Sequence, residues 1–455
     1  MITRVAFILF GVLKYLLIIE FLIALFIIIE GVFNVRVGLR SGYIKTILWL
    51  LQYGKRRLDS KLSAVELFQR PEKTWSQLQA RADLLEDDAA TKPLQVEVEE
   101  MEPSQFKLSS TFTLLRSGLR AIVEDDVTKA FDAEELPYWN LLTRTNKGYQ
   151  YISFRLSVLW GLGFLFRHFL LFPVRLIVCI FGLLFLIITA TICSKLRDGK
   201  IKSRLVTYSS LVSFRILARA LTLHCTYHDR QNKAKKDGIC VANHTSPIDA
   251  VVMSCDNVYS FVGQQHGGPF GFLQNVLAKA FDHIYFERSE AKDRSLVSRR
   301  MHEHILDPSK PPILIFPEGA CVNNTSVMMF KKGSFEVDAL VYPVAIRYNP
   351  IFGDAFWGNQ PTMQDHIWDM MTSWAIVCDV WYLPPTRKMP DEDATQFANR
   401  VRMEIAKKGG LVDIDWDPRF FPESKRPSES RWRKEQQKAL GDRISGKQRN
   451  EPSSD

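Results

Sequence analysis

The segment that decides the fold reads "GICVANHTSPIDA" and runs from Gly238 to Ala250. Its first five residues are small or apolar, which predicts a buried strand at 238–243. A polar turn follows, in which Ser246 is suited to the N-cap of a helix and Pro247 to its first turn. Open α/β sheets bind their ligands beyond the carboxyl ends of the strands, so this turn is a candidate site.

The residues beyond this segment continue the same alternation. Further strands are predicted at 258–263, 283–288, 312–319, 341–348 and 373–383, and helices at 205–223, 248–255, 270–280 and 289–305. Strands that alternate with helices are typical of an α/β fold, here a central mixed sheet flanked by helices.

Two apolar segments precede this domain and indicate N-terminal membrane-embedded helices. The first, Val5–Phe33, is long enough to cross a bilayer, which takes ~20 residues. It contains Lys14 and Glu20, and a cleaved signal peptide is the rival interpretation. The segment is too long for the apolar core of a signal peptide and shows no small-residue cleavage site, which favours a retained anchor.

The second apolar segment, Leu156–Cys193, is too long for one ordinary span. It is interrupted by Arg167, His168, Pro173 and Arg175, and Lys and Arg residues flank both of its ends. Lys and Arg are enriched on the cytoplasmic side of membrane segments. Because both ends of this segment are basic, it is predicted to be a re-entrant hairpin with both ends in the cytosol. An interfacial helix followed by one span, or a single tilted span over 176–193, is an alternative.

The chain is accordingly divided into five regions. They are a membrane anchor with a basic interfacial segment (1–58), a polar, acidic and partly flexible region (59–150), the hydrophobic hairpin with basic flanks (151–204), the α/β domain (205–420) and a charged, disordered tail (421–455).

Composition narrows the classes of partner. The formal net charge is +9, and the sequence contains no nucleic-acid-binding motif. The positive charge is therefore interpreted as favouring an anionic membrane surface, so membrane lipids rather than nucleic acid are the expected partners. The seven cysteines lack paired metal spacing and fit a reducing compartment. The chain also lacks the glycine patterns of nucleotide-binding loops, and neither a metal nor a bound organic cofactor is expected.

The polar turn after the first strand contains an imidazole and a carboxylate, His244 and Asp249. Residues five apart on an ideal helix point in different directions, but a turn before the helix can fold the imidazole back toward the carboxylate. Asp249 would then accept from one ring nitrogen and leave the other basic, as a general base needs. The alternative is that Asp249 only caps its helix and His244 is a solvated turn residue.

Charged residues at other strand ends favour the catalytic interpretation. Arg288 ends one predicted strand, Glu318 and Gly319 end another, and Lys331 and Lys332 follow. Each alone is typical of a solvated surface. Together, cations beside a candidate base indicate a site for a phosphorylated substrate.

Four short motifs resemble, in order and spacing, those of the glycerolipid acyltransferases, the H-x4-D superfamily. They are "HTSPID" (244–249), "FER" (286–288), "FPEG" (316–319) and "VYP" (341–343). The string "GACVNNTSVMMFKKGSFE" resembles the microsomal glycerol-3-phosphate acyltransferase subgroup in particular. One position departs from the family pattern, because Ala320 stands where a Thr or Ser is common, and altered positioning rather than lost activity is expected.

This resemblance implies a role for each matching residue. His244 would deprotonate the acceptor hydroxyl as it attacks an acyl-CoA thioester, with Asp249 orienting the imidazole. Arg288 would bind the phosphate of glycerol 3-phosphate, while Glu318 and Gly319 position the acceptor. Pro343 and its strand would shape the acyl-CoA side of the cleft, and the Lys331 and Lys332 cations suit a phosphate.

The resemblance therefore implies an acyl-CoA:sn-glycerol-3-phosphate 1-O-acyltransferase that forms lysophosphatidate, the first step of phospholipid and triacylglycerol synthesis. Acyl-CoA is a co-substrate rather than a bound cofactor. The expected location is the endoplasmic reticulum membrane with the catalytic domain in the cytosol, and a hairpin anchor also fits the monolayer of a lipid droplet. The alternatives are an acyltransferase with a lysophospholipid acceptor, such as lysophosphatidate, and a catalytically inactive scaffold.

Overall fold

The computed structural model describes residues 2–35, 39–59, 127, 130–131, 134, 154–197, 199–236, 238–265, 267–286, 291–358 and 362–417. The flexible region expected at 59–150 lies almost entirely outside the described residues, and the tail expected at 421–455 lies wholly outside them. Both stay predictions.

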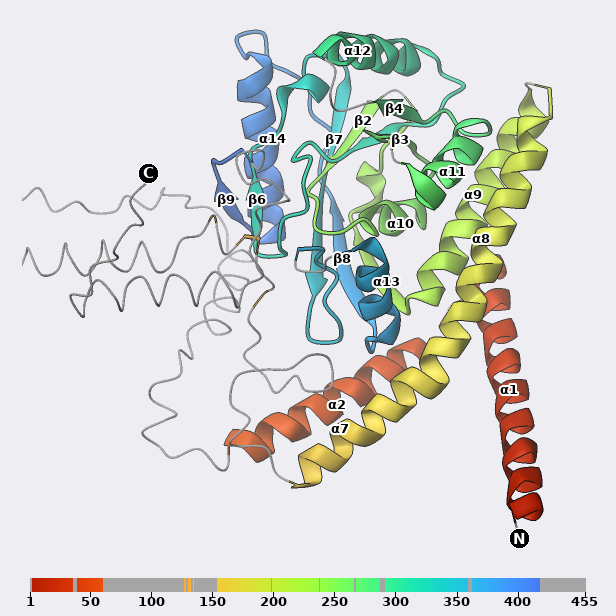
Figure 1. Ribbon diagram of the computed structural model, residues 1–455. Coiled ribbons are helices and arrows are strands. Elements are labelled where there is room, and N and C mark those ends of the chain that lie inside the picture. The colour runs from red at the N-terminus through yellow and green to blue at the C-terminus, as the bar shows by residue number, and fades with distance from the viewer. Residues whose placement is uncertain are drawn as a thin grey trace, which may run out of the picture.

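A seven-stranded sheet with the strand order β1-β8-β7-β2-β5-β3-β4 forms the centre of the α/β domain (Figure 1). Its strands are β1 (Leu223–His228), β2 (Gly238–Ala242), β3 (Ser260–Gln264), β4 (Ile284–Phe286), β5 (Ile313–Ile315), β7 (Leu340–Asn349) and β8 (Ile376–Tyr382). Neighbouring strands are parallel except for β7 and β8, which pair antiparallel. The sheet is therefore mixed, as predicted.

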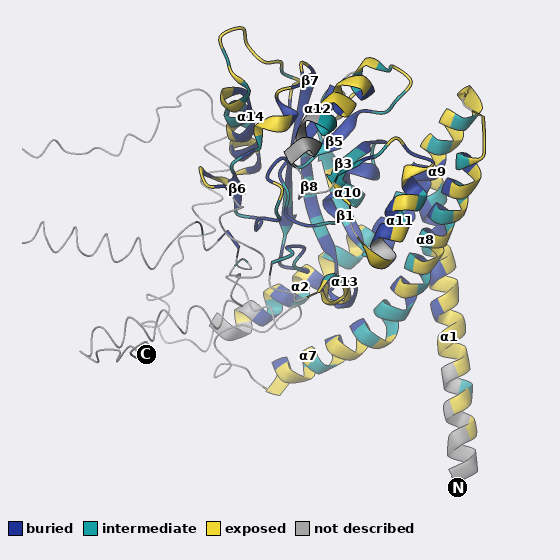
Figure 2. Cartoon of the chain, turned by 45° about the horizontal axis from the view of Figure 1, so that its top comes forward, coloured by how far each residue is buried: buried dark blue, intermediate teal, exposed yellow. Residues whose placement is uncertain are grey.

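Helices cover both faces of this sheet. They are α9 (Lys200–Ala220), α10 (Asp249–Ser254), α11 (Gly268–Ala278), α12 (Ala291–Leu306), α13 (Met363–Thr372) and α14 (Ala394–Gly409). Residues of α9, α10 and α13 pack in one apolar core with the sheet, and residues of α12 and α14 pack in a second core. Beside α14, β6 (Ser326–Met328) pairs with β9 (Val412–Ile414). Buried strands between partly exposed helices are visible in Figure 2.

Strand β1 is not among the predicted strands, since the helical pattern at 205–223 ran to its first residue. It is an edge strand whose side chains after Leu223 are partly or fully exposed, so its sequence "LHCTYH" has no clear apolar alternation. Pairing with β8 makes it a strand.

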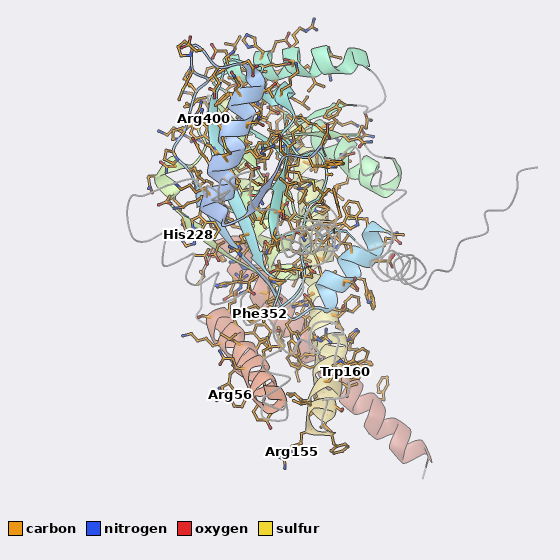
Figure 3. The ribbon with its side chains drawn as sticks, turned by 90° about the vertical axis from the view of Figure 1, so that its left-hand side faces the viewer. Arg56, Arg155, Trp160, His228, Phe352 and Arg400 are labelled. Atoms are coloured by element: carbon orange, nitrogen blue, oxygen red, sulfur yellow. The ribbon has the colours of Figure 1, made fainter. Side chains whose placement is uncertain are left out.

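The apolar segments form long, largely exposed helices. They are α1 (Ile2–Phe33) and, in the second segment, α7 (Phe154–Phe166), the π-helical segment η2 (Arg167–Leu171) and α8 (Phe172–Ser194), while the basic segment between them forms α2 (Leu39–Asp59). Residues 14–33 and 154–195 are long and apolar enough to cross a membrane. Figure 3 shows Arg56 of α2 and Arg155 and Trp160 of α7 at the end of the molecule away from Arg400 of α14. Such helices fit the predicted membrane association.

The structure has a bend where a hairpin was expected. The chain is helical without interruption from α7 through η2 into α8 (Figure 1). Pro173 lacks a backbone N–H and lies in the first turn of α8, directly after the wider π-helical turn, in which Phe172 N–H donates to Arg167 O. The helix can therefore pass the proline without turning back. Helix α8 instead packs beside α9, which follows it after a short connection.

Two arginines of this apolar segment join it to the α/β domain. Arg175 donates hydrogen bonds to the carbonyl oxygens of Met371 (2.7 Å), Ser373 (2.6 Å) and Trp374 (2.7 Å), and Arg167 donates to Thr372 O (2.9 Å). These carbonyls lie at and just beyond the end of α13, where a helix leaves its last C=O groups unpaired and its dipole favours cations. The charges expected at a hairpin apex thus bind the α/β domain.

Candidate active site

The candidate base lies directly beyond the carboxyl end of β2. Asn243 extends the pairing of β2 with β7 through its side chain, because its amide donates to Ile346 O (2.9 Å) and accepts from Ile346 N–H (2.8 Å). The side chain of Asn243 is buried. These two hydrogen bonds to β7 fix the start of the turn that contains His244.

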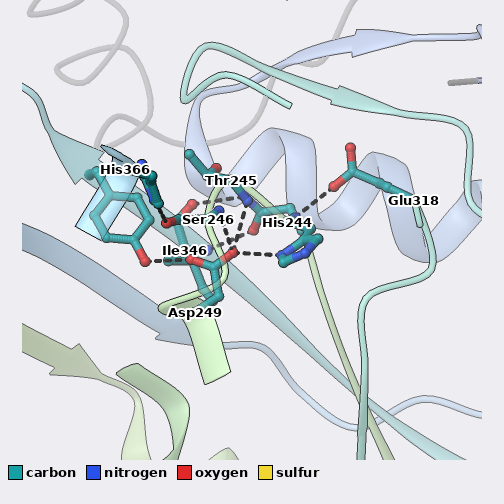
Figure 4. Close-up of polar contacts among 9 residues, drawn as sticks. His244, Thr245, Ser246, Asp249, Glu318, Ile346 and His366 are labelled. Carbon is teal, nitrogen blue, oxygen red and sulfur yellow. Dashed lines mark hydrogen bonds and ion pairs between the residues drawn. The ribbon is translucent and has the colours of Figure 1, made fainter. Parts of the chain in front are cut away.

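The turn brings His244 and Asp249 together, as predicted from their spacing (Figure 4). His244 Nδ1 lies 2.9 Å from Asp249 Oδ2, and the same oxygen accepts the backbone N–H groups of Thr245 (2.8 Å) and Ser246 (2.9 Å). Asp249 is fully buried. An ionised carboxylate only accepts hydrogen bonds, so this contact places the proton on Nδ1 and leaves Nε2 as the basic nitrogen.

The helix after the turn begins later than the sequence indicated. Its N-cap is Ile248 and its first residue is Asp249, so the prediction of Ser246 as the N-cap was wrong. The physical reason is a competing partner: the Ser246 hydroxyl lies 3.2 Å from His366 Nε2, while Ser246 O accepts Asp249 N–H (2.9 Å) in a tight turn. The Asp249 carboxylate therefore accepts the backbone N–H groups of the turn and also holds the imidazole in place.

Two residues of this site were not anticipated from the sequence. The Tyr348 hydroxyl, on β7, donates to Asp249 Oδ1, and His366, on α13, contacts Ser246. Burial lowers the pKa of His366 to about 4, so this imidazole is neutral at physiological pH. Tyrosine in an apolar strand and histidine in an amphipathic helix match ordinary core positions, so no local pattern distinguished them.

The imidazole of His244 is held against an aromatic ring and stays partly accessible. It stacks on Phe316 with ring centroids 4.5 Å apart, and its side chain is 19% exposed. Burial alone would lower the pKa of His244, but the neighbouring Cys321 and the Asp249 carboxylate favour the charged form, and the net pKa is well above its usual value. This site stabilises the imidazolium that forms when the base takes a proton.

Glu318 stabilises the turn through hydrogen bonds to the backbone. Its side chain is fully buried, and its two carboxylate oxygens accept the backbone N–H groups of His244 (2.7 Å) and Met328 (2.9 Å). Burial raises the pKa of Glu318 to about 8, although both N–H groups oppose the rise. Direct contact between Glu318 and an acceptor stays a prediction, since its hydrogen bonds in the structure are to the protein backbone.

The loop after Glu318 brings a cation to the site. Gly319 has a positive φ of 67°, and a β-carbon there would overlap with Lys331 Nζ. Glycine therefore permits both the left-handed backbone and the close approach of the amine. Lys331 N–H also donates to Pro317 O (3.0 Å), which ties the two segments together. Ala320 follows Gly319 and is partly exposed.

The other predicted site residues lie in different surroundings. Lys332 is exposed and forms a surface ion pair with Glu336 (3.2 Å). Pro343 is buried within β7 and pairs in register with Val241 of β2, two residues before Asn243. Arg288 lies outside the described residues. Across the ranges that the structure describes, no group of three or more His, Cys, Asp or Glu could hold a metal ion, and the absence of a bound cofactor stays a prediction.

Comparison with known proteins adds independent information. The Acyltransferase family model matches residues 224–347. The chain is 46% identical over 436 residues to glycerol-3-phosphate acyltransferase 4 of Homo sapiens, covering 93% of each chain. It is also 46% identical over 393 residues to glycerol-3-phosphate acyltransferase 3 of Homo sapiens, covering 86% of this chain and 88% of that protein.

A solved structure, the 1-acyl-sn-glycerophosphate acyltransferase from Thermotoga maritima, matches with a TM-score of 0.38 and 14% identity, over 52% of this chain and 96% of that chain. The length matched in the two human proteins exceeds that of the α/β domain alone. The chain belongs to the glycerol-3-phosphate acyltransferase 3 and 4 family of glycerolipid acyltransferases.

Proposed function

We propose that this protein transfers a long-chain acyl group from acyl-CoA to the 1-hydroxyl of glycerol 3-phosphate and so forms lysophosphatidate. The carrying observation is the His244–Asp249 pair at the carboxyl end of β2, with Nδ1 bound to the carboxylate (2.9 Å) and the imidazole partly accessible. Membership of the glycerol-3-phosphate acyltransferase 3 and 4 family supports the same activity.

The proposed mechanism needs one base and no covalent enzyme intermediate. His244 Nε2 takes the proton of the acceptor hydroxyl as its oxygen attacks the thioester carbonyl. The Asp249 carboxylate stabilises the resulting imidazolium through its contact with Nδ1. The tetrahedral intermediate then expels the CoA sulfur, which takes the proton from Nε2, and the neutral imidazole is regenerated.

Acceptor identity is tested by acyl transfer with the full chain in nanodiscs. Labelled oleoyl-CoA is offered with glycerol 3-phosphate or with lysophosphatidate, and the lipid products are separated. We expect lysophosphatidate from glycerol 3-phosphate at a rate well above that of phosphatidate from lysophosphatidate. Phosphatidate formed from lysophosphatidate alone would move the enzyme to the next acylation step. Transfer to neither acceptor would support an inactive scaffold.

Recognition of the acceptor phosphate is assigned in part to Lys331, whose amine lies against Gly319 beside the site. We expect Lys331→Gln to raise the KM for glycerol 3-phosphate about tenfold, the effect of losing one charge-assisted hydrogen bond. The KM for acyl-CoA should change by less than twofold. Steady-state kinetics with each substrate varied in turn measures both constants.

The neighbouring lysine is the matched control for this measurement. Lys332→Gln removes the same charge one residue away, but Lys332 is exposed and paired with Glu336. We expect it to change either KM by less than twofold, because exposed ion pairs contribute little. Equal effects of the two substitutions would exclude a specific role for Lys331.

Location follows from the helices and from the substrates. The two segments that could cross a membrane support membrane association, and we place the catalytic domain on the cytosolic face of the endoplasmic reticulum. Soluble glycerol 3-phosphate and acyl-CoA meet the membrane at that face. Residence on lipid droplets is the alternative location. Imaging of the tagged full chain with and without added oleate distinguishes lipid droplets from the endoplasmic reticulum.

A further inference from the structure

A cavity lies away from the active site, where the N-terminal helices meet the edge of the sheet. It has a volume of about 480 Å³ and is lined by the α1–α2 junction (Asn34, Arg40 and Ser41), the end of α9, strand β1 and the residues after α10. No active-site residue lines it. In the sheet, β8 and β7 separate β1 from β2, which is three strand spacings or about 14 Å.

The side chains that line this cavity are strongly basic. Four arginines contribute, namely Arg40, Arg215, Arg219 and Arg230, together with one acid, Asp256. Asp256 is shared between two cations, because it pairs with Arg230 (3.2 Å) and also with Lys233 (2.9 Å). Glu30 of α1 also faces Arg219. The positive charge around the cavity therefore exceeds the negative charge that faces it.

Arg219 is the most informative of these residues. Its side chain is only 7% exposed, its Nη1 donates to Arg215 O (3.1 Å), and its Nε has no hydrogen-bond partner among the described residues. Burial, together with the nearby Arg40, lowers the pKa of Arg219 to about 10. A guanidinium that is buried beside other cations and incompletely paired is costly unless an anion accompanies it.

We propose that this cavity, termed the arginine pocket, binds a phosphate group of an anionic phospholipid. Guanidinium groups match phosphate oxygens in geometry and charge, and several of them together favour a phosphate over a carboxylate. The end of α1, which leads into the pocket at Asn34, has exposed apolar side chains at Ile29 and Phe33, and these suit acyl chains next to a headgroup. A lipid is the favoured source because the pocket begins where α1 ends.

The test measures binding to the full chain, purified in neutral detergent, by native mass spectrometry and by the shift in melting temperature. Short-chain phosphatidate, phosphatidylcholine and inorganic phosphate are the three probes. We expect phosphatidate to bind, phosphatidylcholine to bind at least tenfold more weakly, and phosphatidate binding to weaken at high salt. Turnover is not needed for the readout, so failure of the proposed enzymatic function would leave this result interpretable.

Substitutions locate the binding site. Arg230→Gln is chosen because the Arg230 side chain is 48% exposed and its loss leaves Lys233 on Asp256. We expect it to weaken phosphatidate binding about tenfold, with Arg215→Gln as a second, independent variant and Arg230→Lys keeping most of the affinity. Arg299→Gln is the matched control, since Arg299 is 70% exposed and pairs with Glu303 on α12. It should bind like the unchanged protein.

Each outcome decides the proposal. Inorganic phosphate that displaces phosphatidate, with the same dependence on Arg230 and Arg215, would confirm the phosphate site and show that a free phosphate also occupies it. Binding of phosphatidate alone would assign the pocket to lipid. Unchanged affinity in both variants, equal binding of phosphatidylcholine, or no binding of any probe would overturn the proposal.

Discussion

Replacing His244 by alanine is expected to lower kcat for acyl transfer about 10³-fold, with little change in the melting temperature. The size follows from the loss of the general base, which contributes about 10²–10⁴ in rate. The imidazole of His244 is partly exposed and stacks on Phe316, so its removal takes away little buried surface. Product formation from labelled oleoyl-CoA and glycerol 3-phosphate measures the rate.

The chain offers a matched control for this substitution. His228 on the edge strand β1 forms a similar pair with Asp379 on the neighbouring β8 (2.9 Å), but both side chains are about 40% exposed. His228→Ala therefore removes a comparable histidine–carboxylate pair outside the site, and we expect it to keep full activity. A His244→Ala protein with more than a tenth of the original kcat would remove His244 from the role of base.

Asp249→Asn is expected to lower kcat by 10² to 10⁴-fold, in the range seen when the orienting acid of a catalytic triad is neutralised. The asparagine amide would also face the N–H groups of Thr245 and Ser246, which now donate to the carboxylate. We therefore expect a lower melting temperature as well, because a buried donor would meet donors. Asp379→Asn is the control and should change neither quantity much.

The same variant has a defined effect on the pH profile. Neutral His244 is the active form, so kcat/KM rises with pH through the pKa of His244 in the free enzyme. The Asp249 carboxylate helps to hold that pKa above its usual value. Its loss lowers the pKa, and we expect the midpoint of the acid limb of kcat/KM to move to lower pH. An acid limb that stays in place or moves to higher pH would contradict the assigned contact.

The base and its acid were predictable because they are local. His244 and Asp249 are separated by four residues, and a short turn after a strand is enough to join them. The alternation of strands and helices was equally visible, since each element buries an apolar face with its own period. The sheet predicted from that alternation is present, and it is mixed because β8 and its parallel neighbour β1 run opposite to the other strands.

The supports of the site were not predictable, because their partners are distant in the sequence. Tyr348 reaches Asp249 across 99 positions and His366 reaches Ser246 across 120. Both residue types are common in cores, and only the packing of β7 and α13 against the turn shows what they contact. The arginine pocket is a further case, since its cations come from the α1–α2 junction, α9 and the segment after β1.

The amino-acid sequence by itself determined the α/β pattern, the two apolar segments and the pairing of His244 with Asp249. Each depends on neighbouring residues and on the period with which apolar side chains recur. Only the tertiary structure decided that the second apolar segment bends rather than folds back, and that Arg167 and Arg175 bind carbonyls some 200 positions away. The unpaired C=O groups at the end of a distant helix are the reason, since they satisfy buried guanidinium groups that no local pattern could pair.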